Sequence, residues 1–365
     1  MNQLLCFSND TNVKEAFKDY MYHYFSTELK REGFDTYDKS ISFAEKDKKM
    51  NTLLVKEVKA LAGINFSTDS EISKEMWAVN PNIQWATMAV ANSLVDMIIP
   101  DVLDKTIGMY TESRTIAMGD STSFIVEPND LFLVSKAGRD QRTVEFQRQF
   151  EGVVTVVPEN RAITVAVNLY RVLCGMDSLA KFVAKAILSI EQQITREVYT
   201  AFDEAMSQLP TSPESGELRV AGYDKKKVVA LAQRVSAYNN GAPAVFVGTK
   251  LALSEILPDN ANYRYFLDSD YVTLGYIRNM AGFDTIELPQ IAKANGSYEL
   301  ALKDDRFYVL SPSSQKIVKL VYEGSSMTNT IEAYRSANLT ETTTINKSWG
   351  IAIATNATAG IVTTA

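Results

Sequence analysis

Apolar residues recur at helical spacing in two parts of the chain. The first hundred residues contain three such segments, at 12–32, 51–62 and 82–97, and the last of them stops before Pro100. Between residues 178 and 208 the apolar positions fall three or four residues apart, with charged residues mostly between them. At 1.5 Å per residue this pattern predicts a single helix of about 46 Å, long enough to cross a whole subunit.

The stretch between these two helical parts has the pattern of short strands. Runs of β-branched and aromatic residues lie between glycines and prolines, at 123–126, 131–134 and 153–157. They predict a projecting, hairpin-rich extension. Because such an extension has no core of its own, its apolar side chains need a neighbouring surface to cover them. These side chains are Phe124, Phe132, Phe146 and Phe150.

The second half of the chain mixes both patterns. A helix at 225–238 ends at Asn239-Asn240-Gly241, which is a good helix stop. The segments that follow alternate between strand and helix and then become strands throughout. The expected strands are 244–247, 285–288, 307–310, 317–322, 342–344 and 349–354, and the expected helices are 250–256 and 274–280. The chain is therefore predicted to be α+β.

The amino-acid composition limits which kinds of metal or catalytic site the chain can contain. With 46% apolar and 22% charged residues among 365, the chain is an ordinary globular protein. It has one histidine and two cysteines, which excludes a multi-histidine metal site and does not indicate a zinc ribbon or a disulfide framework. His23 lies in an aromatic helical stretch, where we expect a packing role. We expect no catalytic residue, no cofactor and no metal.

The sequence lacks the common catalytic motifs. It has no phosphate-binding loop, dinucleotide-binding glycine pattern, serine-hydrolase elbow or zinc-protease helix. Paired carboxylates occur at Asp268 and Asp270 and at Asp304 and Asp305, and such pairs can hydrolyse glycosides or hold a divalent ion. Because 44 acidic residues produce pairs by chance, we expect solvated loops there. A carboxylate-dependent hydrolase using Asp268 and Asp270 stays open as an alternative.

Net charge and hydropathy limit the partners. The 37 basic and 44 acidic residues give a net charge of -7, which argues against a surface that grips nucleic acid. No apolar run approaches the roughly 18 residues needed to span a bilayer, so no membrane partner is expected.

The two arms of the predicted extension carry net charges of opposite sign. Residues 112–130 carry a net charge of -3 and residues 136–148 a net charge of +2. A solvated hairpin with balanced charge is one interpretation. The other is an arm that lies on a neighbouring subunit, where complementary charge sets register. The expected contact residues are Glu112, Glu127, Asp130, Phe132, Lys136, Arg139, Arg142, Phe146 and Arg148.

Three features stand in a recognisable order. Gly119-Asp120-Ser121-Thr122-Ser123-Phe124 leads into the extension, the long helix follows, and strands at 307–310 and 317–324 precede Trp349-Gly350-Ile351-Ala352 near the end. This order resembles the major capsid proteins of tailed bacteriophages with the Hong Kong 97-type fold. The resemblance covers roughly residues 105–365 and rests on order, spacing and strand character.

The resemblance implies an α+β capsid fold in four parts. These are a helical N-terminal arm (1–105), an extended β-hairpin loop or E-loop (106–165), a peripheral domain (166–241 and 306–365) with the spine helix 178–208, and an axial domain (242–305). Tyrosines of the axial domain would then meet at the centre of each ring of subunits, although ordinary half-buried core aromatics explain them equally well. They are Tyr263, Tyr265 and Tyr271.

The same resemblance implies a structural function in the virion. Copies of the chain would form pentamers and hexamers that tile an icosahedral shell around the phage genome, assembled in the host cytoplasm. The implied partners are the chain itself, a separate scaffolding protein, a portal, decoration proteins, and DNA enclosed without sequence-specific binding. About 105 residues precede the loop, which favours a separate scaffolding protein over an attached one.

Two further points concern alternatives within this family. Lys136 is the sole lysine between residues 112 and 158, so it would be the only loop donor for a cross-link between subunits, a chemistry that we do not expect. A cellular nanocompartment shell of the same fold is the nearest alternative to a phage capsid.

Overall fold

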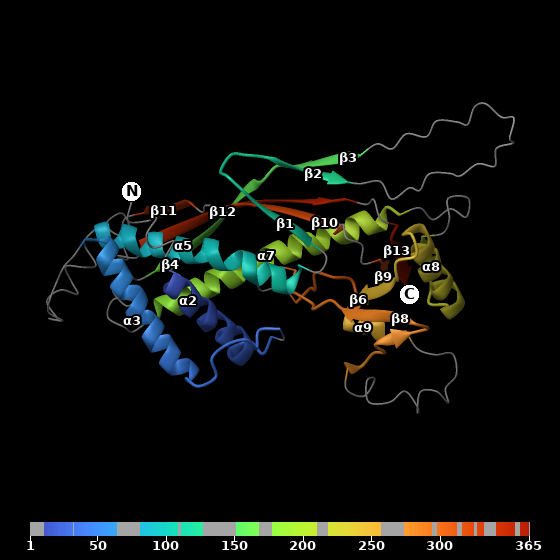
Figure 1. Cartoon of the computed structure of the whole chain (residues 1–365), viewed down its shortest axis with the longest axis horizontal. Coiled ribbons are helices and arrows are strands. Elements are labelled where there is room, and N and C mark those ends of the chain that lie inside the picture. The colour runs from blue at the N-terminus through green and yellow to red at the C-terminus, as the bar shows by residue number, and fades with distance from the viewer. Residues whose placement is uncertain are drawn as a thin grey trace, which may run out of the picture.

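The structure is a computed structural model of the chain (Figure 1). It describes residues 11–31, 33–63, 81–108, 111–126, 151–167, 177–209, 218–256, 274–293, 298–311, 316–324, 327–331, 341–354 and 358–364. The helices are α2 (Thr11–His23), the π-helix η1 (Tyr24–Glu28), α3 (Phe43–Leu61), α5 (Pro81–Thr106), α7 (Leu179–Ser207), α8 (Lys225–Tyr238) and α9 (Lys250–Ser254). The strands are β1 (Thr111–Ile116), β2 (Thr122–Val126), β3 (Gly152–Val156), β4 (Glu159–Val167), β5 (Arg219–Ala221), β6 (Val245–Gly248), β7 (Asn279–Met280), β8 (Phe283–Glu287), β9 (Arg306–Leu310), β10 (Val318–Glu323), β11 (Met327–Ile331), β12 (Glu341–Ile353) and β13 (Gly360–Thr363).

Helix α7 forms the spine of the molecule. Ser178 caps its start, because the Ser178 hydroxyl accepts a hydrogen bond from the backbone N–H of Lys181 at 3.3 Å. One face is buried along its 29 residues, which confirms the helix predicted at 178–208. The helix contacts strands of two different sheets, β12 and β13, so one rigid element supports both halves of the molecule (Figure 1).

Helices α2, α3 and α5 pack together as a layer, and α3 and α5 lie against α7. The helices predicted at 12–32 and 51–62 are present with shifted ends. The first passes into η1 after His23. The second begins at Phe43, because the Ser42 hydroxyl caps it by accepting a hydrogen bond from the Glu45 N–H at 3.4 Å.

Helix α5 contradicts the prediction that a helix stops before Pro100. It continues through Pro100 to Thr106, although a proline inside a helix removes one backbone hydrogen bond. Residues on both sides of the proline are buried, so their packing outweighs that loss. These residues are Ile98, Ile99, Val102 and Leu103.

The same helix corrects the statement that no apolar run is long enough to span a bilayer. Residues Trp85–Thr106 pass that test by length and composition, with a mean hydropathy of 1.4. However, 61% of the most apolar window is buried inside the molecule. The buried Lys347 of β12 also pairs with Asp96 in the middle of α5, with Nζ and Oδ1 2.5 Å apart. These are the contacts of a core helix.

A five-stranded sheet separates two layers of the molecule. Its central strand β12 pairs with β4 on one side and with β10 and β11 on the other, and β1 pairs in parallel with β10. Lys347 and Trp349 of β12 point toward α5 and α7, whereas Gly350 faces the opposite layer. Strand β12 is continuous over 13 residues, where the sequence predicted separate strands at 342–344 and 349–354.

Strands β2 and β3 form a two-stranded ladder on the face away from the helices (Figure 1). Phe124 and Val156 point inward and pack on Val321 of β10. The predicted loop at 106–165 contains strands of two different sheets, and its bounds stay a prediction. Among its described residues, β1 and β4 belong to the five-stranded sheet, and β2 and β3 form the separate ladder.

The second half of the molecule is a six-stranded sheet with the order β5-β13-β9-β6-β8-β7. Helices α8 and α9 cover one face, over Phe246 and Phe307. The end of α7 covers the other face, where Phe202 packs edge-on against Tyr308 with ring centroids 4.8 Å apart. Strands β6, β7 and β8 come from the predicted axial segment, whereas β5, β9 and β13 come from the predicted peripheral segments. The sheet therefore crosses both predicted boundaries.

The helix predicted at 274–280 is wrong over residues 275–280. Gly275 has φ +84°, a conformation that interrupts a helix, and Asn279–Met280 is the short strand β7. The Thr285 N–H donates to the Arg278 carbonyl at 2.8 Å and closes this turn onto β8.

Candidate assembly surfaces

The root of the hairpin is held by its own subunit. Phe124 of β2 is fully buried, and its ring lies near two cations, the Arg114 guanidinium at 4.2 Å and the Lys319 ammonium at 5.5 Å. Lys319, which is 1% exposed, also pairs with Glu112 at 2.5 Å, and Arg114 pairs with the same carboxylate at 2.9 Å. The hairpin therefore leaves the sheet from a fixed anchor.

Glu112 connects the two cations of this anchor. Burial by itself would raise the pKa of Glu112, but hydrogen bonds from Lys319 and Arg114 bring that pKa below its ordinary value. The carboxylate thus stays charged near neutral pH. Its observed partners are within its own subunit, and its contact with a neighbouring subunit stays a prediction.

Gly350 lets the hairpin cross close to the sheet. A Cβ atom at this position would lie 2.6 Å from the Val157 carbonyl oxygen and 2.8 Å from Cγ1 of Val156. Both distances are too short for any side chain. The crossing of β3 over β12 therefore requires glycine, and its neighbour Trp349 fixes the other face by donating to Glu197 of α7 at 2.8 Å.

The outer face of the hairpin root exposes an apolar pair beside the polar pair Ser123 and Thr155. Ile125 and Val153 lie directly opposite each other in the ladder and are 58% and 63% exposed. Val157 and Met118, just outside the two strands, are exposed as well. Exposed β-branched side chains that gather on a projecting element are typical of a surface that a partner covers.

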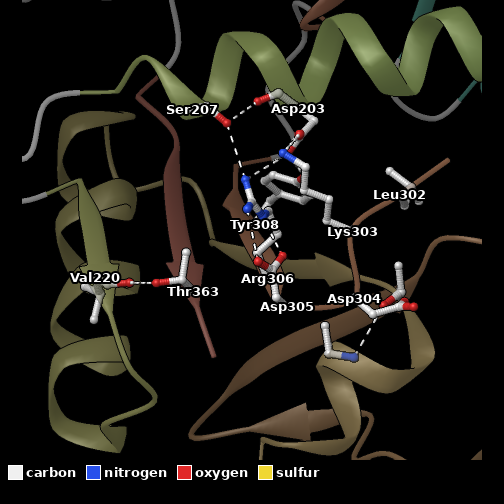
Figure 2. A network of polar contacts seen from close by, with 12 residues as sticks. Asp203, Ser207, Val220, Leu302, Lys303, Asp304, Asp305, Arg306, Tyr308 and Thr363 are labelled. Carbon is white, nitrogen blue, oxygen red and sulfur yellow. Dashed lines mark hydrogen bonds and ion pairs between the residues drawn. The ribbon is translucent and has the colours of Figure 1, made fainter. Parts of the chain in front are cut away.

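A polar network joins the end of α7 to the six-stranded sheet (Figure 2). Asp203 of α7 accepts a hydrogen bond from the Tyr308 hydroxyl at 2.8 Å and pairs with Arg306 at 3.3 Å and with Lys303 at 3.1 Å. Arg306 also contacts both carboxylate oxygens of Asp305, at 2.8 and 3.1 Å. Burial, followed by the charge of Asp203, raises the pKa of Tyr308, so its hydroxyl stays protonated and donates.

Asp304 and Asp305 lie in a turn, and the Asp305 side chain is 48% exposed, as the expected solvated loop implies. Asp304 accepts from the Gln290 side chain at 2.8 Å. The hydrogen bond from Arg306 lowers the pKa of Asp305 below its ordinary value. Asp305 is thus joined to the junction through Arg306, whereas the hydrogen bond of Asp304 lies apart from it (Figure 2).

His23 has the packing role that its aromatic surroundings predicted. It is 6% exposed, and its ring stacks on Tyr37 with centroids 4.4 Å apart. Within the part of the chain that the structure describes, no group of three His, Cys, Asp or Glu residues is placed to hold a metal ion.

Most of the predicted contact residues lie outside the described residues. They are Glu127, Asp130, Phe132, Lys136, Arg139, Arg142, Phe146 and Arg148 in the loop, Tyr263, Tyr265 and Tyr271 in the axial segment, and the pair Asp268 and Asp270. Their roles stay predictions.

The sequence pattern gave the wrong surroundings for Phe124 and did not indicate the exposed pair Ile125 and Val153. Phe124 was expected to be covered by a neighbouring subunit, yet its own chain buries it completely. The run Ser123-Phe124-Ile125-Val126 is apolar at nearly every position, so it does not show which side chains face the sheet. Only the pairing with β3 reveals that Ile125 faces outward.

A spine helix shared by two sheets, with a hairpin rooted on the far face of one of them, is the layout of a Hong Kong 97-type shell subunit. The chain belongs to the family described as "SPbeta prophage-derived putative capsid protein YonB", whose model matches residues 28–363. It is a phage capsid protein, a structural subunit of the shell, and its place is the virion capsid. The predicted fold class and function are thereby confirmed.

Solved capsid structures are similar to parts of the chain at low identity. The capsid of a native GTA particle is 13% identical, with 71% of this chain and 90% of that chain covered and a TM-score of 0.48. The capsid of the cyanophage P-SCSP1u is 12% identical, with 70% and 86% covered and a TM-score of 0.46. The satellite phage P4 procapsid, which includes the size determination (Sid) protein, is 6% identical, with 73% and 89% covered and a TM-score of 0.46. No curated protein matches the chain.

Proposed function

We propose that this capsid subunit joins its neighbours through the hairpin, whose root is anchored on its own sheet and whose outer face rests on the next copy. The observation that carries the proposal is the contrast between the two faces of the ladder. Phe124 on the inner face is fully buried, whereas Ile125 and Val153 on the outer face are mostly exposed. An anchored element with an uncovered apolar face is suited to reach a second subunit.

The charges of the loop support the same assembly mode. Residues 112–130 are net acidic and residues 136–148 net basic, so an arm laid on another subunit would find its register through complementary charge. The contacts proposed for this arm are Glu127, Asp130, Lys136, Arg139, Arg142 and Arg148, with Phe132 and Phe146 supplying apolar area. Glu112 would act from the anchor.

Rings of five and six subunits would place the axial segment, 242–305, at their centres. Tyr263, Tyr265 and Tyr271 are the proposed centre contacts. The spine helix and the terminal strands would form the periphery of each ring, and residues 1–105 the N-terminal arm. Heterologous contacts of this kind close into rings when the rotation between copies permits it.

The charge of the subunit and its sequence motifs support a structural function, and the family resemblance implies its partners. A chain with a net charge of -7 would enclose DNA without gripping it or reading its sequence. We propose a purely structural subunit, without enzymatic activity, that assembles in the host cytoplasm with a separate scaffolding protein, a portal and decoration proteins.

Replacing the outer pair tests the proposal. The double variant Ile125→Ser, Val153→Ser should keep the thermal stability of the subunit, because both side chains are exposed. It should need at least about tenfold more protein to form rings or shells, since one buried apolar side chain contributes more than the about 1.4 kcal/mol of a tenfold change. Sedimentation velocity and electron microscopy measure this.

Thr155→Ser on the same exposed face is the matched control and should assemble like the wild type. Wild-type protein that stays monomeric at all concentrations would contradict the proposed assembly. Unchanged assembly of the double variant would contradict the role of the hairpin face.

A further inference from the structure

The six-stranded sheet has one strongly basic edge. Strand β5 and helix α8 lie at this edge, and α8 packs on β13, β9 and β5 (Figure 1). Residues 218–241 contain five basic residues and a single acidic one, in a chain whose net charge is -7. The basic residues are Arg219, Lys225, Lys226, Lys227 and Arg234.

Three of these cations have no ion-pair partner among the residues that the structure describes. Lys226 and Lys227 are exposed and Lys225 is half-buried. Within the described ranges, none of the three makes an ion pair shorter than 4.0 Å. Three adjacent like charges repel one another, so the fold of the isolated subunit gains nothing from them.

The opposite edge of the same sheet carries acidic residues. It is formed by β8 and β7, with α9 beside them, and its exposed carboxylates are Glu255, Asp284 and Glu287. Lys250 and Arg278 are also exposed there. Among the described residues of this edge, three exposed carboxylates thus stand against two exposed cations, so the edge is net acidic.

We propose that the basic β5–α8 edge of one subunit docks on the acidic β8–β7 edge of a second copy, side by side around the ring. The occupant is a second copy of this chain, because the two edges are opposite in charge and lie at opposite ends of one sheet. A two-fold contact between identical edges would oppose like charges, so the arrangement favours head-to-tail rings. The inference rests on the proposed ring assembly and names the surfaces that it uses.

Reversal and rescue of charge test this contact. The triple variant Lys225→Glu, Lys226→Glu, Lys227→Glu should need at least tenfold more protein to form rings, by sedimentation velocity and electron microscopy. Its isolated subunit should be as thermally stable as the wild type or more so, because glutamates suit the first turn of a helix. Adding Glu255→Lys and Glu287→Lys to the same chain inverts both edges and should restore assembly.

A matched control distinguishes the effect of this contact on assembly from the effect of a changed net charge. Lys48→Glu, Lys49→Glu, Lys56→Glu makes the same charge change on the exposed side of α3, and it should assemble like the wild type. Wild-type rings that weaken as salt rises from 0.1 to 1 M would support the contact, because salt screens exposed charges.

Four results would overturn the inference while leaving the shell function intact. They are normal assembly of the triple variant, equal loss in the α3 control, no rescue by the added lysines, and normal empty shells of the triple variant that fail only to hold DNA. Failure of the wild type to form any ring would instead contradict the proposed assembly itself.

Discussion

Gly350 shows how one missing side chain positions a whole strand. The backbone after β3 passes over Gly350 of β12 so closely that a Cβ atom would meet the Val157 carbonyl oxygen at 2.6 Å. Trp349, one residue earlier, points the other way and contacts α7 through Glu197. These two neighbouring residues therefore set the spacing of the layers on both faces of the sheet.

Gly350→Ala should destabilise the subunit by about 1 to 3 kcal/mol, because β3 must move away from the sheet to make room. Urea unfolding of the isolated subunit measures this. Gly152→Ala is the control, since a Cβ atom there would meet its nearest neighbour, Cβ of Val126, at an ordinary 3.6 Å. Equal stability of the two variants would show that the close crossing is absent.

His23 gives the helical layer a pH response. It is 6% exposed, and its Nδ1 has no hydrogen-bond partner among the described residues. Burial, and then the charge of Lys46, lower the pKa of His23 below its ordinary value. The nearby Asp19, Asp38 and Glu28 carboxylates act in the opposite direction.

The sign of the effect follows from proton uptake. The unfolded chain protonates this group as pH falls through about 6.5, whereas the folded chain does so only at lower pH. The free energy of unfolding should therefore fall as pH drops below about 6.5, by at most about 1.4 kcal/mol per pH unit. Urea midpoints at pH 7.5 and 5.5 measure it, and His23→Gln should lose this part of the slope. An identical slope in the variant would refute the assignment.

At the scale of elements, the hairpin has one face that serves the fold and one that we propose for assembly. Phe124→Ala removes a fully buried ring from the small core with Val156 and Val321. It should destabilise the subunit by about 3 kcal/mol in urea unfolding. Ile125→Ala, one residue along on the exposed face, should leave stability within about 0.5 kcal/mol. Similar losses in both variants would contradict this assignment of one buried and one exposed face.

The junction at the end of α7 should behave as a coupled unit. Asp203→Ala and Tyr308→Phe each remove the 2.8 Å hydrogen bond between α7 and β9. Each should cost about 1 to 3 kcal/mol, and the double variant should cost less than their sum. Lys303→Ala is the control, because its side chain is 57% exposed and should contribute at most about 1 kcal/mol. Additive losses at Asp203 and Tyr308 would contradict the coupling.

Local patterns were sufficient for the elements with their own signals. Helix α8 matches its predicted bounds of 225–238, and α7 differs only at its capping residues. Elements set by distant contacts were not predictable in the same way. Helix α5 continues through Pro100 because buried residues on both sides of the proline hold it in place. Strand β1 belongs to the five-stranded sheet and not to the loop, because it pairs with β10, two hundred residues later.

The candidate site was predictable only in part for the same reason. The sequence indicated a projecting hairpin and its charges, but not the face on which it is anchored. One of the two cations beside the Phe124 ring is Lys319, and no sequence pattern near residue 124 could indicate that contact. The role of Gly350 likewise depends on a strand that crosses it from elsewhere in the chain.

At the scale of the whole molecule, the loop charges predict a change in assembly without a change in folding. Arg142→Glu reverses a charge in the basic arm of the loop and should raise the protein concentration needed for rings. The thermal midpoint of the subunit should not change. Arg142→Lys keeps the charge and is the control. Unchanged ring formation across several such reversals would refute the draped arm.

The order of layers also gives the finished shell two chemically different surfaces. The helices cover one face of the five-stranded sheet and the hairpin the other (Figure 1). In a closed shell every copy turns the same face inward. With the sheet lying along the wall of that shell, helices would form one concentric zone and hairpins the other. A molecule added from outside the particle would then meet only one of these two surfaces.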